Sequence, residues 1–420
     1  MATAPDGQPS RRSQRGLDWL SFFIADAQTA FGPFIAVYLA SMGWAPREVG
    51  LVLAIGGIAS IASQTPGGAL VDAVPAKRAL IGSALALVAA GALILALWPR
   101  FWPVAAAELL HGSTGGVVKP ALAALGLGLV GHGALSGRLG RNQLFNSLGN
   151  GATAGLMGVL GNFVSIRAPF FIAAALCVLA GLALTLIRAK DIDYAEARSA
   201  ADRNNPRKGH RLREAARNRH LHVLIGCLFV FQLANASLVP LVSGRLAYDH
   251  RLAPVLFTSA IVLIPQIVAA ATAMWIARRA EDWGRKPLLL IGLAALSIRA
   301  VLFAVVAGSW VLLPLQVLDG LSAGLIGVLI PLAIADLTRG TGRYNLAQGY
   351  AGTAVGIGAA LSLAGSGFLV EHGGYAASFL ALAAIGLLGF ALLYKLLPET
   401  KPGGTNFTWA RLLHYRKASA

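Results

Sequence analysis

The sequence GALVDAVPAKR, residues 68–78, returns in altered form as EDWGRKP, residues 281–287. Each stretch follows one long apolar run and precedes another, which is typical of a short polar loop between two buried helices. In each, a carboxylate is followed within six positions by two adjacent basic residues. Glu281 follows Asp72 by 209 residues, about half of the chain. The pattern predicts that the chain is an internal duplication.

The composition around these loops is that of a membrane protein. Of 420 residues, 56% are apolar, only 13% are charged and 49 are Gly, and the mean hydropathy is +0.67. The apolar fraction exceeds that of a soluble globule and the charged fraction is about half of it, which argues against a soluble enzyme. About 20 apolar residues span a bilayer, and we expect twelve helical spans: 17–40, 48–71, 79–97, 103–130, 143–164, 168–187, 221–244, 254–277, 287–307, 310–335, 344–369 and 374–396.

The basic residues predict the orientation of these spans. With the amino terminus in the cytoplasm, the inner segments carry 28 Lys and Arg and the outer loops carry five. Because cytoplasmic loops are enriched in Lys and Arg, both termini are expected in the cytoplasm. The net charge of +17 therefore reflects topology and not nucleic-acid binding. We expect a multi-pass protein of the bacterial inner membrane.

The polar segments divide the chain into five parts. Residues 1–16 are expected to be a disordered cytoplasmic tail, because they are largely polar. No small-residue cleavage site follows, so the first span is expected to be a retained helix and not a cleaved signal. Residues 17–187 form the first six-helix bundle, 188–220 a basic solvated linker, and 221–396 the second six-helix bundle. Residues 397–420 form a second cytoplasmic tail, in which one apolar face suggests a short interfacial helix.

The duplication extends into the fourth and tenth spans. Glu108, Gly116 and Pro120 match Asp319, Gly327 and Pro331 at an offset of 211. Together with the two loop stretches, these residues resemble the major facilitator superfamily of secondary transporters over about residues 17–396. The resemblance implies an all-α polytopic fold of twelve transmembrane helices in two pseudo-symmetric six-helix bundles. It also implies a small transported solute and a monomer. The first loop has Pro75 where the family's signature usually has Gly, and the second has Glu281 in place of Asp.

The resemblance implies that the loop residues gate the cytoplasmic side. A carboxylate at the membrane edge can accept hydrogen bonds from the amides at a neighbouring helix start. Asp72 would act as such a latch, with Arg141 a candidate partner. The other residues assigned to gating are Lys77, Arg78, Glu281, Arg285 and Lys286. The alternative is that these basic residues only fix the topology.

Polar side chains inside the spans mark a cavity. An ionisable group near the bilayer centre costs roughly 2.5–3.5 kcal/mol on insertion scales, so it usually faces a cavity or a partner. These residues concentrate in the first, fourth, seventh and tenth spans, which line the central cavity in the resembled family. For substrate binding they are Lys119, His111, Gln28, Asn146, Gln232, Asn235 and Gln316; for proton coupling they are Glu108, Asp26 and Asp319.

Within this set, Glu108 is the first candidate for proton coupling, and the rival assignment gives that role to Asp26. Glu108 and Lys119 share one stripe of a helix but lie roughly 16 Å apart along it, too far to pair. We expect Lys119 to pair with Asp26. Arg299 is expected to pair with Asp319, or else to be a structural ion pair.

The leading functional hypothesis is secondary active transport of a small organic solute by alternating access, coupled to protons, with symport and antiport both open. One alternative is a proton-independent facilitator or exchanger of organic anions; another is an intramembrane enzyme or signalling protein. A pump is disfavoured because no phosphate-binding loop of the Walker type occurs. No metal-binding or cysteine framework occurs either, so no cofactor is expected. The expected partners are a solute, protons and membrane lipid.

Overall fold

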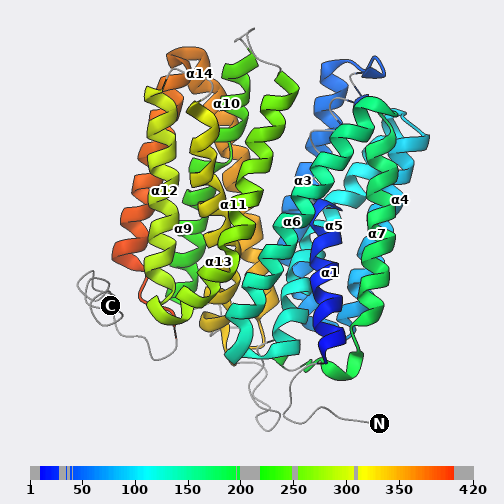
Figure 1. Cartoon of the computed structure of the whole chain (residues 1–420), viewed down its shortest axis with the longest axis vertical. Coiled ribbons are helices and arrows are strands. Elements are labelled where there is room, and N and C mark those ends of the chain that lie inside the picture. The colour runs from blue at the N-terminus through cyan, green and yellow to red at the C-terminus, as the bar shows by residue number, and fades with distance from the viewer. Residues whose placement is uncertain are drawn as a thin grey trace. The chain divides into compact units, whose positions relative to one another are not determined.

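The computed structural model describes residues 10–27, 35, 38, 39, 41–194, 196–198, 218–247, 254–306 and 311–401. These residues are nearly all helical and hold no β-strand, so the predicted all-α fold is confirmed. The helices of the first half are α1 (Arg11–Ala27), α3 (Pro46–Ala73), α4 (Lys77–Leu97), α5 (Phe101–Val130), α6 (Leu135–Phe163) and α7 (Ala168–Leu186). Those of the second half are α9 (Arg219–Asn235), α10 (Leu238–Ala247), α11 (Pro254–Trp283), α12 (Arg285–Val305), α13 (Leu312–Thr338) and α14 (Tyr344–Leu396) (Figure 1).

Eight helices in the described residues are long and apolar enough to cross a membrane. One of them, α14, has 53 residues, more than a single crossing needs. It bends at Gly374, whose φ of 76° lies outside the helical region, and so joins two helices that correspond to the last two predicted spans. The seventh predicted span, 221–244, was expected to be one helix, but it is interrupted between Asn235 and Leu238.

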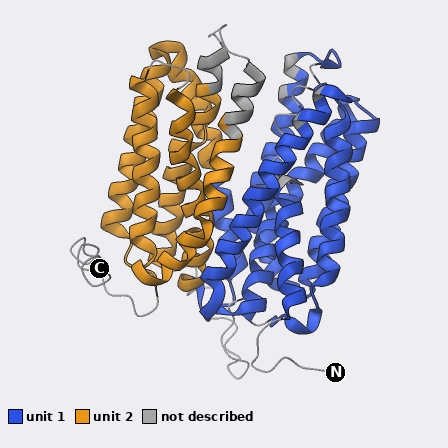
Figure 2. Cartoon of the chain, viewed as in Figure 1, with its two compact units in different colours: residues 1–212, 338–356 blue, residues 213–337, 357–420 orange. Residues whose placement is uncertain are grey.

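The chain forms two compact units (Figure 2). Unit 1 comprises Met1–Leu212 and Thr338–Gly356, and unit 2 comprises Arg213–Leu337 and Ile357–Ala420. In unit 1, α1 packs on α6 and α7, and α5 packs on α3 and α4. The beginning of α14 belongs to unit 1 and the rest of it to unit 2.

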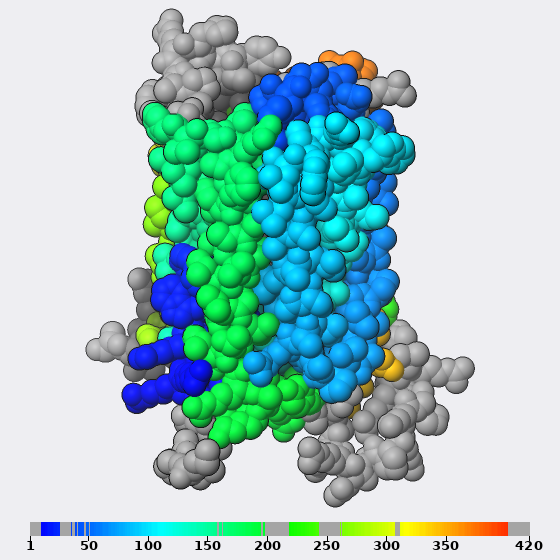
Figure 3. All heavy atoms as spheres, turned by 90° about the vertical axis from the view of Figure 1, so that its right-hand side faces the viewer, coloured from blue at the N-terminus to red at the C-terminus, as the bar shows by residue number. Residues whose placement is uncertain are grey.

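One outer face of unit 1 is apolar. Figure 3 shows α4 and α7 side by side on this face. Their exposed side chains include Leu87 and Leu93 of α4 and Val178, Leu179 and Leu182 of α7. A contiguous exposed apolar surface would be costly in water. This face is therefore suited to contact with lipid.

Glycines set the crossing of the paired helices within each unit. In unit 1 a Cβ on Gly112 of α5 would collide with the carbonyl of Gly56 in α3. In unit 2 a Cβ on Gly320 of α13 would lie 2.5 Å from the carbonyl oxygen of Pro265 in α11. Such contacts need a residue without a side chain at the crossing.

These crossings correct the register of the internal repeat. Gly320 follows Gly112 by 208 residues, and Pro265 follows Gly56 by 209. The sequence match between the fourth and tenth spans used an offset of 211, which is about one helical turn away. By packing, the counterpart of Glu108 is therefore Gln316, not Asp319.

The start of the basic linker also differs from the prediction. Residues 188–198 were expected to be solvated, but Ala197 is fully buried, and the N–H of Asp193 donates to the carbonyl of Gly128 in α5 at 2.8 Å. The cause is the apolar pair Ile192 and Ala197, which packs against the end of α5. The predicted interfacial helix in the last tail lies outside the described residues.

Candidate functional site

The carboxylate of Asp72, at the end of α3, caps the beginning of α14. Oδ2 accepts the main-chain N–H of Leu346 at 2.8 Å, and Oδ1 accepts the main-chain N–H of Asn345 at 3.3 Å and its side-chain amide at 2.8 Å. The first N–H groups of a helix have no partner within the helix and carry a partial positive charge, so they favour a carboxylate. Gly68, one turn earlier, has no room for a Cβ because the carbonyl of Asn345 lies there.

The linker is tied to the same contact. The side-chain amide of Asn345 also donates to the carbonyl of Ala197 at 3.1 Å. Next to it, Glu196 accepts the main-chain N–H of His132 at 3.2 Å, and its Oε1 lies 2.6 Å from Nδ1 of the same residue. Asn345 was not singled out from the sequence, because an amide at a helix start carries no recognisable pattern.

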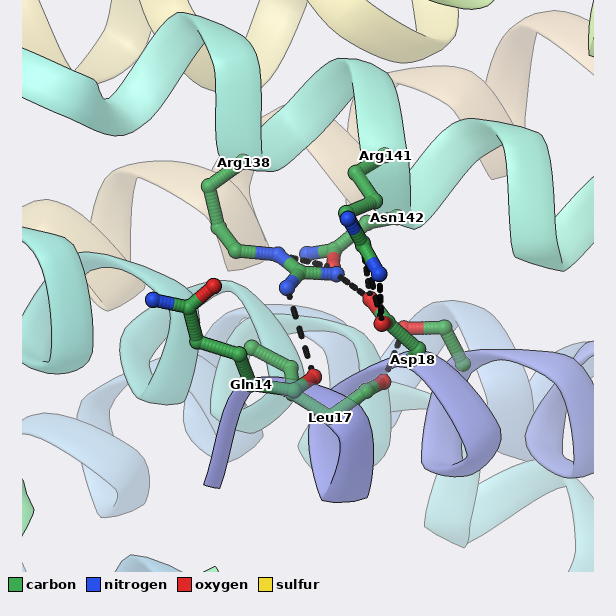
Figure 4. A network of polar contacts seen from close by, with 7 residues as sticks. Gln14, Leu17, Asp18, Arg138, Arg141 and Asn142 are labelled. Atoms are coloured by element: carbon green, nitrogen blue, oxygen red, sulfur yellow. Dashed lines mark hydrogen bonds and ion pairs between the residues drawn. The ribbon is translucent and has the colours of Figure 1, made fainter. Parts of the chain in front are cut away.

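Arg141 does not pair with Asp72, so that prediction is wrong. Its guanidinium binds Asp18 of α1 through Nε, at 2.8 and 2.9 Å, and through Nη2, at 2.6 Å. Arg138, one turn earlier on α6, binds the same carboxylate and donates from Nε to Asn142 at 2.8 Å. Figure 4 shows both guanidinium groups directed at Asp18. Packing of α1 on α6 brings Arg141 to Asp18.

This network holds two buried charges and one exposed charge. The side chains of Asp18 and Arg138 are 2% and 3% exposed, whereas that of Arg141 is 46% exposed. The sequence analysis missed Asp18, because it lies at the very start of a predicted span, and it counted Arg138 only toward topology. Two Arg three positions apart, opposite a lone Asp at the same end of another helix, would have been the signal.

In unit 2 the second loop stretch forms its own network. Arg285 donates from Nε to Asp336 at 2.9 Å and from Nη2 to Glu281 at 3.2 Å. Glu399 accepts the main-chain N–H groups of Arg285 and Lys286 at 2.8 and 3.1 Å, which caps α12. The sequence analysis missed Asp336 and Glu399, since both lie outside the repeated stretches.

The other predicted gating cations make local contacts. Lys77 is fully buried, and its Nζ donates to the carbonyl of Val74 at 2.8 Å. Lys286 donates from Nζ to the carbonyl of Tyr394 at 2.8 Å. Nε of Arg78 is buried and has no hydrogen-bond partner among the described residues.

Glu108 is buried where α5 crosses α3. Its side chain lies against Gly56, where a Cβ would collide with Oε2. The residue is 5% exposed, and Oε1 has no hydrogen-bond partner in the described part of the chain. Absence of a side chain at Gly56 thus provides the space that the carboxyl occupies.

The remaining predicted residues of unit 1 are spread along their helices. Lys119 is exposed and has no ion pair with any described residue, while His111 is partly buried. The side chain of Asp26 and the whole of Gln28 lie outside the described residues, so the predicted pair of Asp26 with Lys119 is untested. Asn146 of α6 accepts a hydrogen bond from Asn150 at 3.3 Å.

In unit 2 three predicted residues meet at one place. Arg299 of α12 is fully buried and forms an ion pair with Asp319 of α13, as predicted. It also donates from Nη2 to Asn235 of α9 at 2.6 Å. Gln316, one turn before Asp319, is fully buried, and its amide has no hydrogen-bond partner among the described residues. Gln232 is half-buried beside Gly358 of α14.

No catalytic or metal-binding arrangement is found in the described residues. They contain no group of three or more His, Cys, Asp or Glu side chains that could hold a metal ion. Both cysteines, Cys177 and Cys227, are buried and form no disulfide bond. The ionisable groups instead form helix caps and buried ion pairs, and Oε1 of Glu108 has no hydrogen-bond partner among the described residues.

Comparison with known proteins identifies the fold family. The chain is 37% identical over 393 residues to MFS-type transporters from two strains of Mycobacterium tuberculosis, CDC 1551 and H37Rv, covering 93% of this chain and 94% of theirs. Its structure resembles that of the human organic anion transporter MFSD10, with a TM-score of 0.68, 18% identity, and coverage of 91% and 99%. It also resembles the transporter FucP in its outward conformation, with a TM-score of 0.71, 16% identity, and coverage of 90% and 97%.

The family model of the Major Facilitator Superfamily matches residues 17–264 and 224–418, which together cover nearly the whole chain. The fold of that family has twelve membrane spans. Its members are transporters and not enzymes, in agreement with the all-helical, apolar structure. The chain therefore belongs to the Major Facilitator Superfamily and is an integral, multi-pass membrane transporter.

Proposed function

We propose that this transporter moves a small organic solute by alternating access and couples that movement to protons through Glu108. The supporting observation is a buried carboxyl whose Oε1 has no hydrogen-bond partner among the described residues. An ionised carboxylate is costly inside a membrane unless it has a partner. Binding and release of a proton at Glu108 must therefore accompany a change in its surroundings, which is what coupling requires.

The other two candidate carboxylates are Asp319 and Asp26. Asp319 already has a permanent cation as its partner, since Arg299 is an ion pair with it. Protonating Asp319 would leave a fully buried guanidinium without its counter-ion, a cost of several kcal/mol. Asp26 remains the rival to Glu108 as the proton carrier.

Solute recognition is assigned to polar groups of both units. Lys119 is an exposed residue within the span of α5, and His111, Asn146 and Gln28 are further candidates on the same unit. On unit 2 we assign Gln232, Asn235 and Gln316. Cationic and amide groups of this kind suit a solute that carries a carboxylate or another anionic group.

Asp72 is proposed as a conformational latch. Its hydrogen bonds to the amides at the start of α14 would form in one state of the cycle and break in the other. Lys77, Arg78, Arg141, Glu281, Arg285 and Lys286 are proposed to hold the surrounding helix ends. Both termini and the linker are assigned to the cytoplasm. The membrane is assigned to the bacterial inner membrane, which the mycobacterial source of two relatives supports.

Reconstituted liposomes test the function. The purified full chain is placed in vesicles that contain a trapped pH-sensitive dye, and a panel of carboxylic acids, amino acids and amines is added from outside. A transported solute should change the internal pH and should accumulate when a proton gradient is imposed. Glu108→Gln should abolish both effects and retain counterflow of solute, whereas Glu371→Gln, which alters an exposed carboxylate, should behave as wild type.

A second candidate function is proton-independent exchange of organic anions. The observation that favours it is the exposed Lys119, which has no ion pair with a described residue and can hold an anionic solute. One structurally similar protein carries organic anions by its own title. Saturable counterflow of a carboxylic acid without any change in internal pH would support this exchanger and contradict proton coupling.

A further inference from the structure

Glu108 in α5 and Gln316 in α13 occupy equivalent places in the two units. Each lies four residues before a glycine that leaves no room for a Cβ beside the paired helix, Gly112 or Gly320. Gly112 meets Gly56 of α3, and Gly320 meets Pro265 of α11. The two glycines differ by 208 positions, as do Glu108 and Gln316.

A second pair of glycines agrees with this register, with a looser contact in unit 2. A Cβ on Gly116 would collide with the carbonyl of Ser63 in α3, and one on Gly324 would lie 3.2 Å from Oγ1 of Thr272 in α11. Gly324 again follows Gly116 by 208 positions, and Thr272 follows Ser63 by 209. The equivalence of Glu108 and Gln316 therefore rests on packing at two successive helical turns.

The two side chains are both buried but differ in chemistry. Glu108 is 5% exposed and Gln316 is 0% exposed. Oε1 of Glu108 and both polar atoms of the Gln316 side chain have no hydrogen-bond partner among the described residues. A buried polar atom left unpaired lowers stability, because it has lost its hydrogen bonds to water. Glu and Gln have nearly the same shape, but only the carboxyl can bind and release a proton.

The residues one turn further on also differ between the units. The counterpart of His111 in α5 is Asp319 in α13, again 208 positions later. Asp319 is held by Arg299, which also binds Asn235. Unit 2 therefore keeps its nearby carboxylate in a fixed ion pair and places a neutral amide at the buried position.

We propose that this pair of equivalent places binds one proton and not two. Glu108 is the proton-binding group, in unit 1, and Gln316 keeps the equivalent place in unit 2 permanently neutral. The assignment rests on the proton coupling proposed above. It adds that the proton binds in unit 1 and that the two equivalent positions together bind one proton. An equal pair of carboxyls would instead bind a proton in each half of the transporter.

Dicyclohexylcarbodiimide tests the assignment without a known solute. This apolar reagent adds to the O–H of a protonated carboxyl in apolar surroundings, and the adduct rearranges to a stable acylurea that retains all atoms of both reactants. The full chain in liposomes is treated, digested and analysed by mass spectrometry. We expect the adduct on Glu108 in α5 and none on α13, including Asp319.

Three variants complete the experiment. Glu108→Gln should lose the adduct on α5, and Gln316→Glu should gain a second adduct on α13 in addition to the first. Gln316→Leu, which removes the amide without adding a carboxyl, should leave labelling of Glu108 unchanged. The wild-type chain and Glu108→Gln show whether Glu108 is the proton-binding group even if Gln316→Glu does not fold.

An unlabelled Glu108, or an adduct on Asp319 of the wild-type chain, would overturn the assignment. Failure of the proposed function gives a different result. If Glu108 is labelled but no solute moves protons in the liposome assay, the proton-binding place stands and the coupling does not. If solutes move protons while Glu108 stays unlabelled, only the present assignment fails.

Discussion

Oδ2 of Asp72 in α3 accepts the main-chain N–H of Leu346 in α14 at 2.8 Å, across 274 residues of sequence. A carboxylate from one helix thus caps the first turn of another, and the cap is buried, since Asp72 is 4% exposed. The family's loop signature acquires a physical meaning from this contact. Gly68 lets the two main chains approach, and Asp72 supplies the acceptor.

Asp72→Asn should loosen the first turn of α14. The variant loses the negative charge and one acceptor oxygen, and hydrogen bonds to a charged group contribute about 1.5–3 kcal/mol. Amide hydrogen exchange of Asn345 and Leu346 should therefore accelerate roughly 10- to 100-fold, measured by mass spectrometry of the peptide that contains them. Asp282→Asn is the matched control, because Asp282 is 44% exposed and pairs only with the neighbouring Arg279 in the described residues. Unchanged exchange in Asp72→Asn would show that the cap contributes little.

The two arginines that bind Asp18 should differ in their contribution to stability. Arg138→Met should lower the thermal unfolding temperature in detergent more than Arg141→Met, because the side chain of Arg138 is buried and that of Arg141 is half exposed. Removing one partner of a buried pair costs about 3–5 kcal/mol, whereas exposed pairs contribute about 0–1 kcal/mol. Asp18→Asn should resemble Arg138→Met. Equal effects of the two arginine variants would contradict this division.

Much of the fold could be predicted from the sequence, because hydrophobic length and loop charge are local properties. The spans around residues 79–97 and 168–187 needed only an apolar run with polar ends, and α4 and α7 match them closely. The break between Asn235 and Leu238 has a local cause that the expectation of one continuous span overlooked. Pro240 has no N–H to donate to the carbonyl of Ala236, and its ring crowds that carbonyl. The contact that holds the break could not be predicted. The side chain of Ser237 binds that of Ser362 in α14 at 2.8 Å, a contact 125 residues away.

The sequence predicted which residues form polar contacts better than it predicted which residues they contact. Asp72 as a helix cap and the pair of Arg299 with Asp319 followed from the cost of leaving a charge unpaired in a membrane. The partner of Arg141 could not be predicted in this way. Asp18 and Asp72 lie at the ends of different helices, and only the packing of the helices selects between them. The predicted register of the repeat was wrong for a similar reason. Offsets of 211 and 208 place residues on nearly the same helical face, and only the glycines at the helix crossings distinguish the two offsets.

The contact of the first helix with the linker should depend on pH. Partial desolvation raises the pKa of Asp191, but the hydrogen bonds donated by Ser10 and Ser13 together outweigh that effect. The pKa of Asp191 therefore lies below its ordinary value. Because the folded-state pKa is depressed, the stabilisation is present above the ordinary Asp pKa of about 3.9 and is lost as the pH falls through the lower, folded-state value. Hydrogen exchange of residues 10–14 should therefore rise in that acid range in wild type, and in Asp191→Asn it should already be raised at neutral pH. A variant with wild-type exchange at neutral pH would contradict the role of the carboxylate.

The crossing of α5 and α3 makes a sharp prediction about two neighbouring glycines. Gly112→Ala should destabilise the protein, because its Cβ would meet the main chain of Gly56 and lie 3.0 Å from the amide nitrogen of Ser60. Overpacking of this kind costs about 1–3 kcal/mol. Gly115→Ala, three residues on, should instead be neutral or stabilising. Its Cβ would have only ordinary contacts, at 3.7 and 3.9 Å, with the flexible side chains of Ser60 and Gln64, and Ala is better than Gly within a helix by about 1 kcal/mol.

The same contrast tests the corrected register of the repeat. Gly320→Ala in α13 should be destabilising like Gly112→Ala, because its Cβ would lie 2.5 Å from the carbonyl oxygen of Pro265 and 2.6 Å from Cβ of Val268. Gly292→Ala in α12 is its control, since among the described residues its Cβ would meet only the side chain of Leu325, at 3.6 Å. Thermal unfolding of the four variants in one detergent gives the ranking. If Gly320→Ala unfolds at the wild-type temperature while Gly112→Ala does not, the two crossings are not equivalent. The match of Glu108 with Gln316 would then lose its structural basis.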